Sequence, residues 1–211
     1  MSGLPPAPSG QALSLVSALS NTENHQLHVQ AIRARDDALS ASPESYGNLC
    51  LQLTYVLAGS DQPAQLLPRI AQRDLTAWQE TDSQTVHRLQ HDEGMWTPFG
   101  QMAGLVLKNA LLRPPLNQQQ SQNNGNAGPR TFLYLQSPAA DHIKETLLYS
   151  LGCRHAELRA VASSVIATTA VSADGVQPAL HLTAWPQLIP ALIGYLQQHS
   201  HDNHERIEGA L

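Results

Sequence analysis

The chain has 211 residues and a formal net charge of −5. This length suits one sizeable domain or a short repeat array, and the acidic balance argues against nucleic-acid binding, which needs clustered Lys and Arg. Hydrophobic residues make up 42% of the chain, charged residues 14% and aromatic residues 5%, and Ala and Leu dominate the apolar set. This composition favours packed helices over sheets.

Cysteine usage and the start of the chain indicate the compartment. Cys50 and Cys153 both lie in apolar runs, which predicts two buried thiols in a reducing environment rather than a disulfide. Residues 1–10 lack the basic start and apolar core of a signal peptide, and no apolar run reaches the roughly 20 residues that span a bilayer. We therefore expect a soluble intracellular protein without membrane insertion, and disorder in residues 1–10.

Apolar residues recur at helical spacing along most of the chain. The helices predicted from this pattern, in chain order, are 11–20, 25–40, 46–58, 97–112, 139–151, 156–173 and 188–198, with a last one starting near His204. Pro43 is expected to end the second of them. Two helices per unit at a period of about 40–47 residues are typical of HEAT or armadillo repeats. The predicted fold is all-α: an α-solenoid of about four HEAT-type hairpins across residues 11–211, the last one truncated.

The helix at 97–112 has the clearest pattern. Thr97 is the predicted N-cap and Pro98 the first helical residue. The apolar stripe that we expect to be buried consists of Met102, Leu105, Val106 and Leu112, with the single amide Asn109 among them. Gly104 and Ala103 are expected to permit close helix packing.

Two segments interrupt the repeat pattern. The first is an insert near residues 61–95, in which Leu67, Ile70 and Trp78 recur at roughly helical spacing and predict an added helix. The second is the Gln/Asn/Gly-rich loop near 114–136, which we expect to be disordered because it cannot bury enough apolar surface.

Catalytic and metal-binding patterns are weak. The chain contains neither G-x-x-x-x-G-K-[S/T] nor G-x-G-x-x-G, and Ser163, Ser164 and His155 form no nucleophile elbow. The tail H-S-H-D-N-H-E at 199–205 lacks the order H-E-x-x-H, so a surface turn is favoured over a metal site. We expect no enzyme activity, no cofactor and no bound metal.

Several motifs together resemble one family. They are A-I-R-A-R-D-D-A-L (31–39), A-G-L-V-L-K-N (103–109), H-I-K-E-T-L-L-Y-S-L-G (142–152), the segment L-R-A-V-A-S-S-V-I-A-T-T-A-V-S-A-D-G (158–175) and W-P-Q-L-I-P (185–190). In this order they are similar to the amino-terminal repeats of the importin-β (karyopherin-β) family, in its transportin (karyopherin-β2) branch. The resemblance implies HEAT repeats, with Arg159, Trp185, Pro186 and Pro190 at structural repeat positions.

The resemblance also implies a function in nuclear import. The amino-terminal repeats of these receptors bind the GTPase Ran in its GTP form through their second helices. Lys108 and Asn109 match the K-N pair of the family and are the candidate Ran-binding residues. Two alternatives stay open for them: Lys108 as a surface cation that complements the helix dipole, and Asn109 as an inter-repeat hydrogen-bonding group. Arg159 is expected in a polar ladder between repeats.

The wider implications concern partners and location. Cargo carrying a nuclear localisation signal would bind through later repeats, which are missing because the chain reads as truncated at Leu211. Nucleoporins are the further partners implied, and the protein would shuttle between cytoplasm and nucleus through the pore. Gly100 departs from the family, which commonly has Arg there, so any contact of that Arg is lost. The alternatives are a helical-repeat interaction scaffold unrelated to Ran, or a non-functional truncated remnant.

Overall fold

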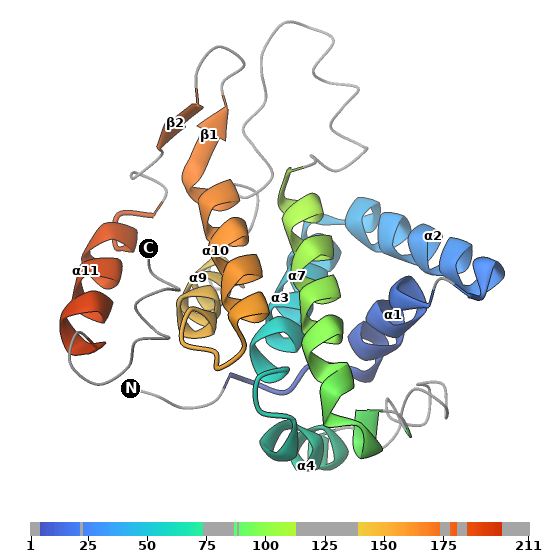
Figure 1. The fold of residues 1–211 in the computed structure, drawn as a ribbon. Helices are drawn as coiled ribbons and strands as arrows, with labels where there is room; N and C mark the ends of the chain where they lie inside the picture. Colours follow the sequence, from blue (N-terminus) through green and yellow to red (C-terminus); the bar gives the residue numbers. More distant parts are fainter. Residues whose placement is uncertain are drawn as a thin grey trace, which may run out of the picture.

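The computed structural model describes residues 5–21, 23–73, 87, 89–112, 139–173, 178–180 and 185–199. The elements in this part of the chain are α1 (Gly10–Ser20), α2 (His25–Ala41), α3 (Pro43–Gly59), α4 (Pro63–Arg73), the 3₁₀ turn η1 (Glu93–Met95), α7 (Trp96–Leu112), α9 (Ala139–Ser150), α10 (Ala156–Ala170), β1 (Val171–Ala173), β2 (Pro178–Leu180) and α11 (Leu188–His199). Packed helices dominate, and β1 and β2 form one short hairpin, so the predicted all-α class is confirmed (Figure 1).

Local signals explain where the first helices begin. The Ser9 side chain accepts a hydrogen bond from the backbone N–H of Ala12 and caps α1. Ser42 caps α3 in the same way, and Pro43 is the first residue of that helix. Pro43 therefore begins α3 as well as following the end of α2. The predicted start of this helix at Tyr46 is therefore three residues late.

Residues 5–9 lie against the core in an extended segment. Ala7 is 5% exposed, and the Ser9 N–H donates to Oε1 of Gln52 in α3 at 2.7 Å. We expected disorder throughout 1–10, but these five residues are ordered because an apolar side chain and a backbone donor both find partners on the packed helices. The composition of a Pro-rich start gave no sign of such partners.

The start of α7 differs from the prediction. Thr97 is not its N-cap but its second residue, because the helix begins at Trp96 directly after η1. The capping residue lies further upstream: the Asp92 side chain accepts from the N–H of Gly94 and caps the 3₁₀ turn. Pro98 still falls within the first turn of α7, where its missing N–H has no intrahelical partner to lose.

The helices form two rows, α1–α7–α10 and α2–α3–α9, and α7 packs on α3 where the rows meet. Helix α7 lies between α1 and α10, and α3 lies between α2 and α9 (Figure 1). In the hairpins α3–α7 and α9–α10, first helix packs on first helix and second on second. The first hairpin departs from this order, since α1 packs on α7 while α2 packs on α3.

The insert contributes a helix, as predicted. In α4, Leu66 is 4% and Ile70 1% exposed, so this helix buries one face on the core while Pro68 is exposed. The Leu66 side chain packs against Gly59 at the end of α3. Trp78, which we expected to continue this helix, lies outside the described residues.

The predicted helix 156–173 ends three residues early. Residues Val171–Ala173 form β1, which pairs antiparallel with β2 in the register Val171↔Leu180, Ser172↔Ala179 and Ala173↔Pro178. β-Branched Val171 favours a strand, and the hydroxyls of Thr168 and Thr169 just before it bond to the carbonyls of Ser164 and Ile166. The predicted disordered loop 114–136 and the predicted helix near His204 lie outside the described residues.

Candidate protein-interaction surface

One side of α7 is exposed although it carries large apolar residues. We define the α7 outer face as Gln101, Met102, Leu105, Lys108, Asn109 and Leu112. Leu105 is 48% and Leu112 55% exposed, while Met102 and Lys108 are half-buried. The predicted buried stripe was therefore wrong for Leu105, Asn109 and Leu112, and only Val106 from that set is buried. An exposed apolar helix face of this kind marks a surface that suits a protein partner.

Small residues decide which side of α7 faces the core. A Cβ added to Gly104 would lie 2.1 Å from Cγ1 of Val161 in α10, and one added to Gly100 would lie 2.6 Å from Cβ of Ser60. Ala103 is fully buried beside them, so the close packing predicted for Ala103 and Gly104 is confirmed. α7 turns its smallest residues toward α3 and α10, and its bulky Leu105 and Leu112 consequently point outward.

Gly100 has a structural role in this arrangement. Its added Cβ would also meet Cδ2 of Leu158 at 2.8 Å, so no larger side chain fits there without movement of its neighbours. Arg at this position would have to displace the corner after α3 as well as α10. Gly100 is thus a point of close contact between α7, the end of α3 and α10.

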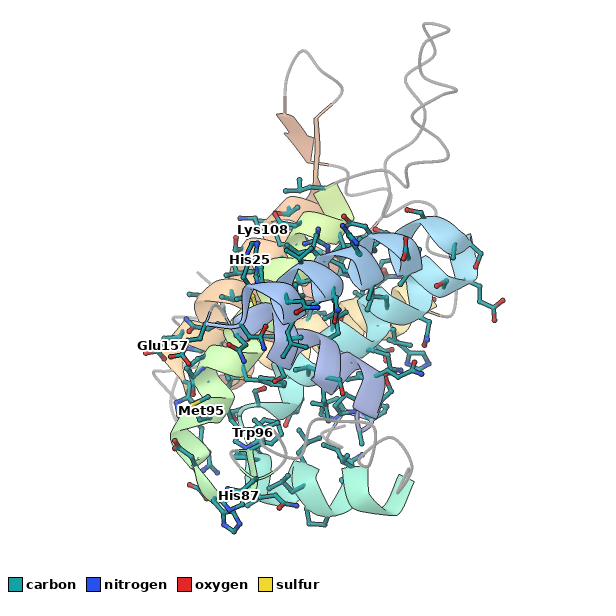
Figure 2. All side chains as sticks on the ribbon, turned by 90° about the vertical axis from the view of Figure 1, so that its right-hand side faces the viewer. His25, His87, Met95, Trp96, Lys108 and Glu157 are labelled. Carbon is teal, nitrogen blue, oxygen red and sulfur yellow. The ribbon has the colours of Figure 1, made fainter. Side chains whose placement is uncertain are left out.

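Lys108 joins the two second helices of the stacked hairpins. Its Nζ donates to Oγ of Ser164 in α10 at 2.6 Å, and the side chain remains half-buried at the edge of the α7 outer face. Figure 2 shows Lys108 near the end of α7. The ammonium group has further donors beyond this bond, since a lysine carries three. Asn109, the other candidate, is exposed on the outer face.

Arg159 holds the turn between α9 and α10. It is 5% exposed, and its Nη1 donates to the carbonyls of Cys153 at 3.0 Å and Arg154 at 2.8 Å. The sequence did not predict a role for Asp61, which follows α3 and binds the same turn. Its carboxylate is 6% exposed and accepts from the backbone N–H groups of Arg154 and His155.

Asp61 makes a polar joint between hairpins, at a turn that Arg159 holds from within its own hairpin. The carboxylate takes the two N–H groups at the start of α10, where the positive end of the helix dipole favours an anion. The guanidinium of Arg159 donates hydrogen bonds to the carbonyls of the same turn. The bonds of Arg159 lie within its own hairpin, so its predicted place in a polar ladder between repeats stays a prediction. Asp61 was missed because a single acid after a helix end gives no signal of its long-range partner.

The motif 185–190 leads into α11. Trp185 is 2% exposed, and its carbonyl accepts from the N–H of Leu188 at 3.1 Å as the helix begins. Pro186 and Pro190 are both exposed. Pro190 stands in the first turn of α11, where proline is tolerated. Trp185 is thus a core anchor, and the two prolines shape the helix entry.

Tyr46 and Cys50 are buried ionisable groups in neighbouring turns of α3. The Tyr46 hydroxyl donates to the carbonyl of Ala110 in the last turn of α7 at 3.0 Å, which satisfies a helix-end acceptor. Burial raises the pKa of Tyr46 well above its ordinary value, and burial raises the pKa of the Cys50 thiol to about 12. Cys50 and Cys153 are both buried and neither forms a disulfide, as predicted. Neutral groups with raised pKa values suit packing rather than nucleophilic chemistry.

The described part of the chain has no group of three or more His, Cys, Asp or Glu side chains placed to hold a metal ion. In the same part, none of the helices has the length and apolar character needed to cross a membrane. Comparison of the chain with protein-family models, curated proteins and solved structures found no match.

Proposed function

We propose that this chain is the amino-terminal HEAT-repeat part of an importin-β-type nuclear transport receptor, and that it binds Ran in its GTP form through the α7 outer face. One observation carries the proposal: Leu105 and Leu112 are about half exposed on the same side as Asn109, beside Lys108. This is the helix on which the family resemblance places the K-N pair. Nuclear import and shuttling through the pore follow as parts of the proposal.

The proposed solenoid rests on the stacking of hairpins. The α3–α7 and α9–α10 pairs have equivalent helices side by side, as helical repeats do. In that arrangement α7 and α10 are both second helices and belong to one layer. Asp61 supplies a polar link between neighbouring units through its bonds to the α9–α10 turn. The different packing of α1 and α2 would make the first hairpin an atypical terminal unit, which repeat arrays commonly have.

Recognition would depend on the ordered state of the GTPase. GTP orders the switch segments of such proteins, and hydrolysis releases them. Leu105 and Leu112 would bury their exposed halves against an apolar part of the ordered switch, which contributes about 1 kcal/mol each. Asn109 would hydrogen-bond to backbone groups, and Lys108 would face an acidic side chain. Cargo and Ran-GTP would oppose each other by linkage through later repeats.

Binding of the full chain to Ran tests the proposal. Ran loaded with a non-hydrolysable GTP analogue is expected to bind, and Ran loaded with GDP is expected to bind at least about tenfold more weakly. The double variant L105A/L112A should lose about tenfold or more in affinity for the GTP form, since it removes two apolar anchors. Surface plasmon resonance with immobilised Ran measures both.

Leu27→Ala is the matched control. Leu27 is 42% exposed on α2, close to the exposure of Leu105, but it lies on another helix. Its replacement should leave the affinity within about twofold. Equal binding of the two nucleotide states, or an L105A/L112A variant that binds like wild type, would contradict the proposal and favour a scaffold unrelated to Ran.

A further inference from the structure

Two histidines in the insert lie ring to ring on the surface. His87 and His91 are four residues apart in a helical turn, both are exposed, and their ring centroids are 4.4 Å apart with the planes tilted by 50°. This spacing places both imidazoles on one helix face. Figure 2 shows the His87 ring projecting from the edge of the molecule, away from the packed helices.

The helical turn that carries these rings is fixed to the core through Leu89. Leu89, between the two histidines, is 3% exposed. Its carbonyl accepts a hydrogen bond from Nε1 of Trp96 at 2.7 Å, and Trp96 is itself 1% exposed at the start of α7. The backbone between the rings is thus tied to the core, and both imidazoles are held on the solvent side. A pre-positioned ligand pair loses less conformational entropy on binding than two independent side chains.

We propose that His87 and His91 bind one divalent transition-metal ion of the class Zn²⁺, Ni²⁺ or Cu²⁺. Neutral imidazole is a preferred ligand of these ions, and two histidines at positions i and i+4 share one helix face in known zinc motifs. Water would complete the coordination, because two imidazoles fill only part of the coordination sphere of such an ion. The expected order of affinity places Cu²⁺ above Ni²⁺ and Zn²⁺.

The histidines near the C-terminal end of the sequence must be replaced before metal binding by His87 and His91 is tested. His199, His201 and His204 lie within a few residues of each other and offer a competing set of imidazoles. The full-length background protein therefore carries Asn at these three positions. Calorimetric titration of this background with Ni²⁺ is expected to show one equivalent bound. His87→Asn and His91→Asn should each weaken binding by about tenfold or more, because a single imidazole loses the chelate advantage.

His142→Asn is the control variant. His142 is an exposed histidine on α9, away from the pair in sequence, and its loss should leave the affinity unchanged. His87, His91 and His142 are exposed, so unchanged thermal midpoints of their variants without metal verify the fold. A background protein that binds no Ni²⁺ overturns the proposal. So does a His87→Asn/His91→Asn double variant that binds as tightly as the background, or an equal loss in His142→Asn.

Discussion

At Gly104, α7 and α10 approach so closely that a methyl group has no room. An added Cβ would lie 2.1 Å from Cγ1 of Val161. Helix propensity alone favours Gly104→Ala by about 1 kcal/mol, but overlap in a packed core costs about 1–3 kcal/mol. We expect the steric cost to prevail and the variant to lose about 1–2 kcal/mol of unfolding free energy. Urea unfolding followed by circular dichroism measures this change.

Two further variants separate packing from propensity. Gly194 in α11 has no atom within 4 Å of an added Cβ, so Gly194→Ala should gain up to about 1 kcal/mol. Combining Gly104→Ala with Val161→Ala removes the clash, and the double variant should be more stable than the sum of the single effects. A Gly104→Ala protein with a wild-type or higher urea midpoint would contradict the close contact.

The buried pair Tyr46 and Cys50 predicts a loss of stability at alkaline pH. Burial raises the pKa of Cys50 from 9.0 to about 12 and that of Tyr46 above its ordinary 10.0. Both groups are uncharged when protonated, so the folded state retains protons that the unfolded chain releases. Stability that is fully present below pH 9 is therefore lost as pH rises, by about 1.4 kcal/mol per pH unit and group.

Urea midpoints between pH 8 and pH 11 test this dependence. Cys50→Ala removes the thiol, so the loss attributable to this pair should then begin only near pH 10, where Tyr46 of the unfolded chain ionises. Identical pH profiles of the wild type and Cys50→Ala would show that the thiol is not protected by the fold.

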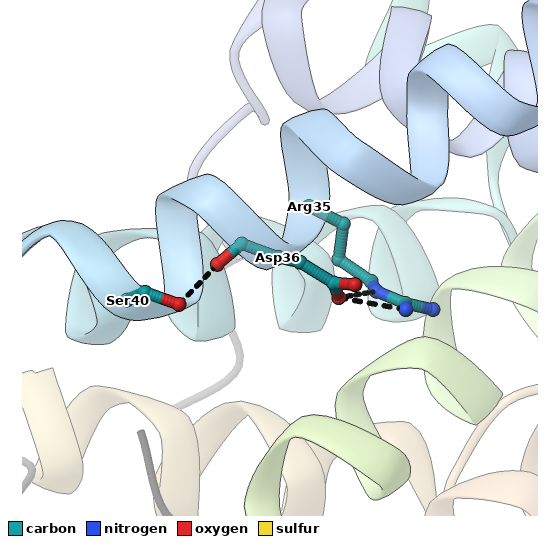
Figure 3. Close-up of polar contacts among 3 residues, drawn as sticks. All are labelled: Arg35, Asp36 and Ser40. Atoms are coloured by element: carbon teal, nitrogen blue, oxygen red, sulfur yellow. Dashed lines mark hydrogen bonds and ion pairs between the residues drawn. The ribbon is translucent and has the colours of Figure 1, made fainter. Parts of the chain in front are cut away.

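At the scale of elements, the joint between hairpins should matter more than a surface ion pair. Asp61→Ala leaves the N–H groups of Arg154 and His155 without their acceptor, which costs about 1–3 kcal/mol. Asp36 provides the comparison: it pairs with Arg35 on α2 at 2.7 Å, but its side chain is 47% exposed (Figure 3). Asp36→Ala should cost less than about 1 kcal/mol. Thermal unfolding of the two variants measures the contrast, and equal losses would contradict it.

Helix positions were largely predictable, but the buried face of α7 was not. Caps and apolar spacing place most helix ends within a few residues, because these signals are local. α7 is apolar on nearly all sides, so periodicity alone did not distinguish the face of Leu105 and Leu112 from the opposite one. The face that is buried is the one with Gly100 and Gly104, because they allow close contact with α3 and α10. The pattern of a single helix does not contain this information.

Long-range polar partners were equally hidden from the sequence. Asp61 and the turn that it holds are more than ninety residues apart, and the bond of Lys108 to Ser164 also joins separate helices. Neither has a spacing rule from which it could be inferred. Apolar residues in a helix pattern predict that stacking occurs, whereas the order of stacking, such as the changed packing of α1 and α2, depends on side-chain shape.

For the molecule as a whole, stacked hairpins predict that the two buried thiols become accessible by different routes. Cys153 lies in the turn of the α9–α10 hairpin, and Cys50 lies in α3, which other helices cover on several sides. Each unit of a repeat array contacts only its neighbours, so the proposed solenoid predicts that α9–α10 opens without the rest. The test uses single-thiol variants at low urea. Cys153 in the Cys50→Ala variant should react with a thiol reagent about tenfold or more faster than Cys50 in the Cys153→Ala variant. This ratio corresponds to a difference of about 1.4 kcal/mol in opening free energy.

Each rate is compared with the global stability of its own variant. Equal rates at every urea concentration would instead mean that the chain opens as one cooperative unit, and the independent hairpins on which the proposed solenoid rests would be lost.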